Sequence, residues 1–273
     1  MRHLLLGFLL LAALCTPRLV AAQTPPAPSA ADVKIYEDFR YWLSKQPPGS
    51  PGAPLERYQE ELKAQGVESA EVERRIKVIN QRGSRLEVER WNRILTAEKP
   101  TFNTNPNEFL VRMTKGRTPG TALDVGMGQG RNALYLAQQG WKVTGFDPAE
   151  KAVAAAQAQA KALGVTLETR VEGDETFDFG QNRWDLIVLS YVSLRDLVPK
   201  VVASLTPGGM VVIEGFHRDA TKNASIGGGV VFDTNELLKL FDALRVVQYE
   251  DANAVGDFGK TDTRVVRLAA QKR

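Results

Sequence analysis

One stretch, residues 123–137 (LDVGMGQGRNALYLA), constrains this chain more than any other. It predicts a short buried strand, a turn with Gly126, Gly128 and Gly130, and the start of an amphipathic helix. Glycines at such a turn let the backbone approach a ligand closely, because no Cβ intervenes. The first turn of the helix offers unpaired N–H groups to a polar or negative ligand. The stretch therefore predicts a cofactor-binding strand–turn–helix unit.

The spacing of the glycines narrows the choice of cofactor. A dinucleotide fingerprint reads G-x-G-x-x-G, and its third glycine would fall at position 131, which is Arg131. The pattern here is an acid, Asp124, two residues before the first of three alternating glycines. The spacing argues against a dinucleotide, and the flanking residues must decide between the remaining cofactors.

The first 22 residues differ from the rest of the chain. Arg2 and His3 precede an apolar run over 4–14, and small residues end the segment at Ala22. This pattern predicts a secretory signal peptide (1–22), and the run is shorter than the ~20 residues that span a bilayer. We expect an exported chain, periplasmic or secreted, with no stable membrane span after cleavage. An uncleaved apolar anchor or a misassigned start codon is the alternative, and a misassigned leader would leave the protein cytoplasmic.

Charge and cysteine content exclude several classes of function. Without Arg2 and Arg18 the chain has 33 basic and 32 acidic residues, a net charge of +1, and no Lys/Arg run. This balance does not favour a nucleic-acid partner. Cys15 is the only cysteine and leaves with the leader, so no disulfide or cysteine zinc site is predicted. No His/Asp/Glu cluster has metal-ligand spacing, so no metal site is predicted.

The segment before the glycine loop predicts a separate helical part. Residues 23–54 form a linker in which two Pro-rich patches flank a short docking helix. Residues 55–104 have apolar positions at helical spacing and predict an appendage of two or three helices. Gly83 interrupts this pattern, and Ser84 with Glu87 makes a capping box that predicts a third helix. The appendage either covers the mouth of the site or braces the N-terminal side.

A second domain is predicted over residues 105–273. Asn105 and Pro106 predict a helix start, and that helix should end near Lys115. Beyond it, strands and helices alternate, with strands predicted at 121–125, 141–146, 166–171, 185–190, 210–214, 244–249 and 264–269. This alternation predicts an α/β fold, a doubly wound and mostly parallel seven-stranded sheet with helices on both faces.

Acidic side chains follow the first three predicted strands. In a doubly wound sheet, ligands bind at the carboxyl ends of the strands. Asp124 lies inside the first strand, near its carboxyl end, and Asp147 ends the second, where a carboxylate can accept both ribose hydroxyl hydrogens. Asp174 and Glu175 follow the third, where an acid can accept from an adenine amino group. The alternative makes Asp124 a cap of the following helix and Asp147 a turn residue.

These residues, with the Pro-Gly-Gly turn at 207–209, resemble the motifs of class I S-adenosylmethionine-dependent methyltransferases over residues 120–215. The resemblance implies a Rossmann-like methyltransferase fold and S-adenosyl-L-methionine as cofactor. Asp124 would lie near the sulfonium end of the cofactor or hold the loop. The other cofactor-binding residues that it implies are Gly126, Gly128, Gly130, Arg131, Asn132, Asp147, Asp174 and Glu175.

Four further segments are similar to the tellurite-resistance methyltransferases, namely 131–137, 140–147, 235–237 and 255–262. That family methylates soft anionic nucleophiles, and it has a His-Arg pair before the final hairpin and an arginine shortly after. Gly259, Lys260 and Arg264 occupy these places here, so the histidine is missing. Lys260 and Arg264 remain as two predicted cations for an anionic acceptor.

Two residues near the strand ends are candidates for the acceptor side. His217 follows the fifth strand and could take a proton from an attacking group, or it is a solvent-exposed loop residue. Tyr191 follows the fourth strand and is either an acceptor contact or a packing residue. The glycine-rich loop 221–229 is either a mobile lid or a flexible connector.

The resemblance implies an enzyme that transfers a methyl group to a small-molecule acceptor by in-line displacement. Such a displacement depends on positioning and electrostatics rather than on a metal. Two alternatives stay open: an aminopropyl-type transferase on the same fold, and an exported non-catalytic module that keeps the fold. The second alternative arises because S-adenosylmethionine is made in the cytosol, whereas the leader predicts export.

Overall fold

The computed structural model describes residues 28–46, 53–222, 228–258 and 262–273. The predictions that lie wholly or partly outside these residues are the leader (1–22), the two Pro-rich patches (24–28 and 46–54), the glycine-rich loop (221–229) and Lys260.

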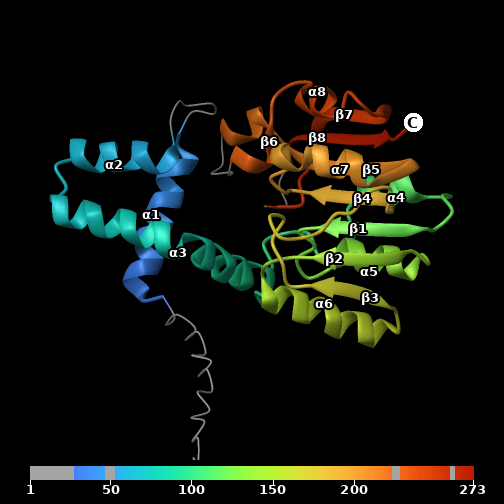
Figure 1. The fold of residues 1–273 in the computed structure, drawn as a ribbon, viewed down its shortest axis with the longest axis horizontal. Coiled ribbons are helices and arrows are strands. Elements are labelled where there is room, and N and C mark those ends of the chain that lie inside the picture. The colour runs from blue at the N-terminus through green and yellow to red at the C-terminus, as the bar shows by residue number, and fades with distance from the viewer. Residues whose placement is uncertain (1–27, 47–52, 223–227, 259–261) are drawn as a thin grey trace, which may run out of the picture.

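A mixed sheet forms the centre of the larger part of the molecule (Figure 1). Its strands are β1 (Thr121–Val125), β2 (Lys142–Phe146), β3 (Leu167–Arg170), β4 (Trp184–Ser190), β5 (Leu205–His217), β6 (Val231–Phe232), β7 (Arg245–Val255) and β8 (Asp262–Gln271). The order is β3-β2-β1-β4-β5-β8-β7, with β6 beside β5. Among the described strands, β8 pairs antiparallel with β5 and with β7, and the other pairs are parallel. The predicted doubly wound, mostly parallel α/β fold is confirmed, and the two-residue β6 is an addition too short to show in the sequence.

Helices cover both faces of the sheet. They are α4 (Glu108–Thr114), α5 (Arg131–Gln138), α6 (Glu150–Leu163), α7 (Val198–Ser204) and α8 (Glu236–Leu240), with 3-10 turns at Arg195–Leu197, Arg218–Lys222 and Gly228–Val230. Phe109 of α4 and Leu136 of α5 pack on one face, and Val201 of α7 and Leu237 of α8 pack on the other. Because helices cover both faces of the sheet, the side chains on both faces of its central strands are buried, and these strands appear in the sequence as continuous apolar runs.

The N-terminal appendage consists of α1 (Ala30–Ser44), α2 (Pro54–Ala64) and α3 (Ser69–Leu95). Its own core includes Phe39, Tyr58 and Val72, all buried, with Trp42 packed against them. Ring centroids of Phe39 and Tyr58 lie 5.2 Å apart, within the range of favourable aromatic pairs. The appendage therefore has a hydrophobic core separate from that of the sheet.

The predicted helix break at Gly83 is wrong, because α3 continues through it. A Cβ on Gly83 would lie 3.4 Å from a ring carbon of Tyr36, so the glycine lets α1 pack closely on α3. Glu87 does not complete a capping box with Ser84. It accepts hydrogen bonds from Tyr36, Arg40 and Trp91 instead, and so joins α1 to α3.

The start of α4 also differs from the prediction. Asn107, not Asn105, is the N-cap, and its Oδ1 accepts a hydrogen bond from the N–H of Leu110 at 3.0 Å. Pro106 therefore precedes the helix instead of occupying its first position. Asparagine is a favourable N-cap residue at either position. The contacts of Asn107 with distant segments, through Asn132 and Asp257, favour it over Asn105.

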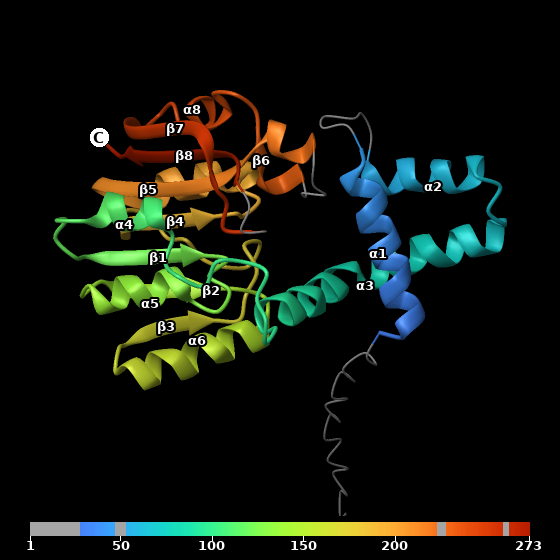
Figure 2. The same cartoon turned by 180° about the vertical axis from the view of Figure 1, so that it is seen from behind.

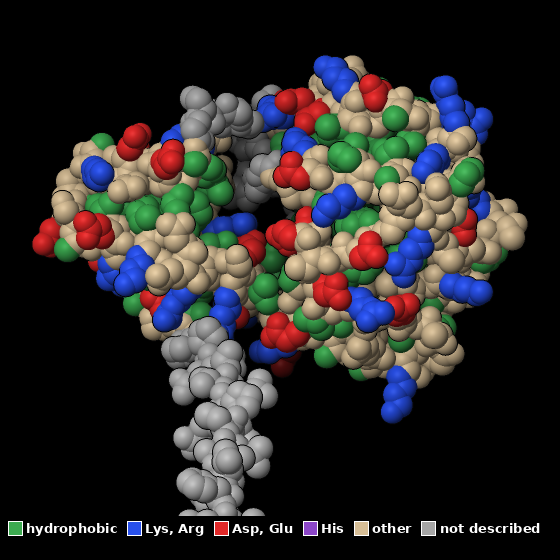
Figure 3. All heavy atoms as spheres, viewed as in Figure 1, with side chains coloured by type: hydrophobic (Ala, Val, Ile, Leu, Met, Phe, Trp, Pro, Cys, Tyr) green, Lys and Arg blue, Asp and Glu red, His purple; other side chains and the backbone are tan. Residues whose placement is uncertain are grey.

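The C-terminal end of α3 meets the sheet at the carboxyl ends of its parallel strands (Figures 1 and 2). Leu95 packs there with Phe102 and with Ala149 and Ala152 at the start of α6. Basic and acidic side chains are interspersed on the face of the molecule drawn in Figure 3. Within the described segments, no helix combines the length and the apolar character that a membrane span needs.

Candidate functional site

The three loop glycines have backbone conformations that other residues rarely adopt. Their φ angles are +63° at Gly126, +56° at Gly128 and +81° at Gly130, all in the left-handed region. A Cβ on Gly126 would lie 2.7 Å from Cγ1 of Val192, and one on Gly130 would lie 2.9 Å from Cβ of Ala156. The loop therefore requires glycine for its conformation and for its close contacts.

Asp124 holds the start of the helix that follows the loop. Its Oδ2 accepts a hydrogen bond from the N–H of Ala133 at 3.0 Å, and the residue is only 2% exposed. Burial raises the pKa of its carboxyl to about 7, although the nearby Arg131 opposes the rise. This contact is to the first turn of α5, as expected if Asp124 caps the following helix. Its position near a sulfonium stays a prediction.

Asp147 joins the end of β2 to the glycine loop. Its Oδ2 accepts from the N–H of Gly128 at 2.9 Å, and its Oδ1 accepts from the N–H of Ala149 at 2.8 Å. Burial raises the pKa of this carboxyl above its ordinary value. Each carboxylate oxygen has two lone pairs, so each can accept one further hydrogen bond from a ribose hydroxyl.

Asp174 and Glu175 lie in the turn after β3. Burial, and then the neighbouring Glu175 carboxylate, raise the pKa of Asp174. The Nζ of Lys200 donates to the backbone carbonyl of Asp174 at 3.0 Å and connects the turn to α7. The predicted contact of these two acids with adenine remains a prediction.

The side chains of Arg131 and Asn132 bind neighbouring segments of the chain. Arg131 pairs with Asp257 at 2.5 Å and donates to the carbonyl of Asn105 at 2.9 Å. Asn132 is 3% exposed, accepts from the N–H of Asn107 at 2.9 Å and donates to Oγ of Ser190 at 3.3 Å. Through these contacts, both residues join the start of α5 to neighbouring segments of the chain.

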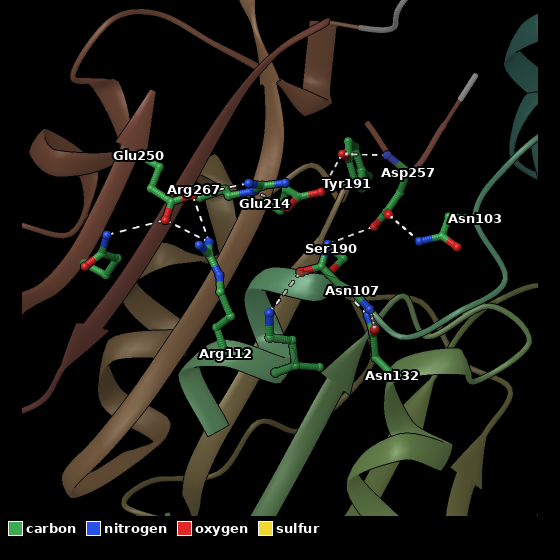
Figure 4. A network of polar contacts seen from close by, with 12 residues as sticks. Asn103, Asn107, Arg112, Asn132, Ser190, Tyr191, Glu214, Glu250, Asp257 and Arg267 are labelled. Atoms are coloured by element: carbon green, nitrogen blue, oxygen red, sulfur yellow. Dashed lines mark hydrogen bonds and ion pairs between the residues drawn. The ribbon is translucent and has the colours of Figure 1, made fainter. Parts of the chain in front are cut away.

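Asp257 is the main residue that the sequence reasoning missed (Figure 4). Its carboxylate accepts from Nδ2 of Asn103 at 3.0 Å, from Nδ2 of Asn107 at 2.8 Å and from Arg131. Its N–H donates to the hydroxyl of Tyr191 at 3.0 Å. It thereby connects four segments that are distant in sequence. The sequence drew attention to Asp257 only because it lies in the segment 255–262, which resembles a known family. Its spacing from other polar residues gave no indication of a role.

Tyr191 has both sides of its hydroxyl engaged. The hydroxyl accepts from the Asp257 N–H and donates to Oε1 of Glu214 at 2.6 Å, while Arg267 binds the other oxygen of Glu214 at 2.5 Å. Burial and the carboxylates of Glu214 and Asp257 raise the pKa of the phenol, so it stays protonated. Its φ of +58° marks a strained backbone at the end of β4. These contacts favour the packing interpretation over direct contact with an acceptor.

His217 and Arg264 belong to a second polar cluster. His217 is 5% exposed, so the expectation of a solvent-exposed loop residue is wrong. Its Nδ1 accepts from the N–H of Asp219 at 3.1 Å, so the neutral ring has its hydrogen on Nε2, 3.0 Å from Oγ1 of Thr234. Arg264 binds Asp251 at 2.6 Å and Asp219 at 2.8 Å. Its guanidinium is therefore neutralised by two carboxylates, and Lys260 lies outside the described residues.

The residues at the loop fit an adenosyl cofactor. Asp147 offers paired acceptors for the ribose hydroxyls, and it is hydrogen-bonded to the loop through the N–H of Gly128. The described segments hold no group of three or more His, Cys, Asp or Glu side chains that could bind a metal ion.

The part of the chain that contains the glycine loop is similar to a known protein family. Residues 122–209, which include the loop and Asp147, match the family described as "Methyltransferase domain". The fold of this part of the chain is the class I methyltransferase fold. The predicted resemblance to S-adenosylmethionine-dependent methyltransferases is confirmed for this domain.

Two curated relatives support the same conclusion for the methyltransferase domain. A probable S-adenosyl-L-methionine-dependent methyltransferase, TehB of Haemophilus influenzae, is 26% identical over 166 residues, 58% of this chain and 57% of TehB. A ubiquinone biosynthesis O-methyltransferase of Rhizobium etli is 32% identical over 141 residues, 44% of this chain and 56% of that protein. The matches thus span little more than half the length of each relative. They agree with the predicted cofactor, S-adenosyl-L-methionine.

Two solved structures share the fold of the methyltransferase domain. The crystal structure of TehB from Haemophilus influenzae aligns with a TM-score of 0.53 at 21% identity, over 61% of this chain and 62% of TehB. The N-methyltransferase NodS from Bradyrhizobium japonicum, in complex with S-adenosyl-L-homocysteine, aligns with a TM-score of 0.55 at 20% identity. That alignment covers 68% of this chain and 97% of NodS.

Proposed function

We propose that this protein transfers the methyl group of S-adenosylmethionine to a small-molecule acceptor by in-line displacement. The observation that supports this most directly is the hydrogen bond between Gly128 and Asp147, which joins the glycine loop to the acid at the end of β2. The cofactor supplies a methyl group that is already activated on a sulfonium. The chain then needs mainly to bind, orient and exclude water.

Each part of the site has a proposed role toward the cofactor. The free lone pairs of Asp147 accept the ribose hydroxyl hydrogens, and the backbone of the Gly126–Gly130 loop lies along the methionine part. Asp174, with Glu175 beside it, accepts from the adenine amino group. Arg131 and Asn132 keep the helix start and its neighbours in place through Asp257 and Ser190.

The acceptor that we propose is a small molecule. Arg264 gives little support to an anionic acceptor, because Asp251 and Asp219 already bind its guanidinium. The proposal of an anionic acceptor therefore depends on Lys260.

The predicted leader leads to a proposal on location. We infer from residues 1–22 that the chain is exported to the periplasm or secreted. The test fuses the leader to a reporter that is active only after export, with Leu4–Leu14 broken by two arginines as control. Export of the unaltered fusion alone supports the proposal, and retention of both fusions contradicts it.

Calorimetric titration of the purified protein with S-adenosylmethionine and S-adenosylhomocysteine tests the proposed activity at its first step. Asp147→Ala removes two charged hydrogen bonds of ~1.5–3 kcal/mol each, so we expect the dissociation constant to rise about a hundredfold or more. The control is Asp242→Ala, at an exposed aspartate after α8. Absence of binding by the unaltered protein at millimolar ligand would refute the proposed function. Binding that persists in the Asp147 variant would mean that the ribose lies elsewhere.

A further inference from the structure

Asn92, near the C-terminal end of α3, connects the appendage to the methyltransferase domain. It is 3% exposed, and its Oδ1 accepts a hydrogen bond from the N–H of Lys151 at 2.9 Å. Lys151 lies in the first turn of α6, whose N-cap, Ala149, has no side chain that could cap the helix. Asn92 therefore caps α6 from a helix that is distant in sequence.

The other half of the Asn92 amide has no partner among the described residues. Its Nδ2 is buried and makes no hydrogen bond there. The orientation of the amide follows from chemistry, because the Lys151 N–H is a donor and must face the oxygen. A buried donor without an acceptor costs about 1–3 kcal/mol, so its retention indicates an acceptor outside the described chain.

The surroundings of Asn92 indicate which acceptor this is. One turn along α3, Cδ2 of Leu95 lies 3.2 Å from where a Cβ of Gly128 would be. Ala149, at the start of the helix that Asn92 caps, donates its N–H to Asp147. The end of α3 therefore lies against the glycine loop, and it is joined to the start of α6, which in turn binds Asp147 (Figures 1 and 2).

We propose that Nδ2 of Asn92 donates a hydrogen bond to a ribose hydroxyl oxygen of the cofactor, which makes the helical appendage part of the cofactor site. A hydroxyl has one hydrogen to donate and lone pairs to accept with, so the same group can donate to Asp147 and accept from Asn92. This proposal rests on the proposed function, because it requires that an adenosyl cofactor binds at Asp147.

The substitution Asn92→Asp separates the two halves of the amide. The carboxylate keeps an oxygen for the Lys151 N–H, so the helix cap is retained, but it has no donor in place of Nδ2. The matched control is Asn80→Asp, the same chemical change at an exposed position of α3. Thermal unfolding of both ligand-free variants establishes that they fold.

The measurement is calorimetric titration with S-adenosylhomocysteine. We expect the dissociation constant of Asn92→Asp to rise about tenfold or more, since one hydrogen bond is lost and a second carboxylate is placed near Asp147. Asn80→Asp should bind as the unaltered protein does. Affinity of Asn92→Asp within twofold of the unaltered protein would overturn the proposal.

Three uncharged probes then identify the acceptor: 5′-methylthioadenosine and its 2′-deoxy and 3′-deoxy analogues. The added charge acts similarly on all three, so the comparison isolates the hydrogen bond. The ratio of dissociation constants between Asn92→Asp and the unaltered protein should fall toward one for the analogue that lacks the contacted hydroxyl. An equal ratio for all three probes would overturn the ribose assignment.

The outcomes separate this proposal from the proposed function. If the unaltered protein binds no S-adenosylhomocysteine, the proposed function fails and this proposal fails with it. If the unaltered protein and Asn92→Asp bind equally, only the role of Asn92 is refuted.

Discussion

Asp257→Asn should destabilise the protein far more than the loss of an ordinary surface charge. Asp257 is 6% exposed and accepts from Asn103, Asn107 and Arg131, whose side chain is 12% exposed. The amide cannot accept on both sides, so its NH₂ group must face at least one of these donors. Removing one partner of a buried ion pair costs about 3–5 kcal/mol. Arg131 keeps its bond to the Asn105 carbonyl, so we expect a loss near the lower end, about 3 kcal/mol.

Urea unfolding followed by tryptophan fluorescence measures this loss, because Trp141 and Trp184 are buried in the methyltransferase domain. The control is Asp38→Asn, which breaks an exposed pair with Lys34 and should cost less than about 1 kcal/mol. An unfolding free energy within about 1 kcal/mol of the unaltered protein would refute the argument for Asp257.

A double-mutant cycle with Arg131→Met isolates the ion pair itself. The two residues are in contact, so their interaction energy should be about 1–3 kcal/mol. Strictly additive losses would mean that the effect of Asp257→Asn comes from Asn103 and Asn107 and not from the guanidinium.

Three further predictions concern the loop and the second polar cluster. The pKa of Asp124, raised to about 7 in the folded state from 3.8, means that the unfolded chain loses this proton first, so stability falls as pH rises from about 4 to 7. Asp124→Asn should therefore gain stability relative to the unaltered protein between pH 5 and pH 8, by at most about 3 kcal/mol. An equal difference in unfolding free energy at both pH values, measured by urea unfolding, would contradict this. Gly126→Ala should lower the free energy of unfolding by about 1–3 kcal/mol, measured by thermal unfolding. Adding Val192→Ala should recover the part of this loss that comes from the steric clash, but not the part that comes from the backbone strain at φ +63°. Full recovery of stability in the double variant would show that the backbone conformation does not contribute. His217→Asn keeps an acceptor for the Asp219 N–H, so methyl transfer to a confirmed acceptor should stay within about threefold, whereas a loss of about a hundredfold would identify His217 as the general base.

The parts of the fold that could be predicted are those with a local signal. β1 and β2 were placed within one residue, and the start of α5 was predicted directly after the glycine turn, because a buried parallel strand, a glycine turn and an amphipathic helix each leave a pattern in consecutive residues. The break at Gly83 was predicted wrongly because its cause is not local. A glycine within a helix weakens it in isolation, but here it makes room for the ring of Tyr36 on another helix.

The residues of the candidate site also fall into two groups, those that a local sequence pattern indicates and those whose role depends on distant contacts. Asp124 and Asp147 could be found because each lies within a residue of the carboxyl end of a strand, and these ends meet at one edge of a parallel sheet. Arg264 was expected to face an anionic acceptor. Its pairing with Asp251 could not be foreseen, since it depends on the register between β7 and β8, and its pairing with Asp219 depends on the position of the turn after β5. Asp257 gave no pattern of its own, because its partners come from three segments that are distant in sequence.

Three buried acids hold the glycine loop, and each does so from a different direction. Asp124 binds the N–H of Ala133 behind the loop, Asp147 binds the N–H of Gly128 within it, and Asp257 binds Arg131 at its end. Fixed donors and acceptors need not reorganise when a ligand binds, so this arrangement reduces the entropic cost of binding. The third of these acids lies beyond residues 122–209, the part that matches the methyltransferase family. Contacts outside the family motif therefore help to hold the motif in place, and cofactor affinity in this chain should depend on Asp257 as well as on the glycines.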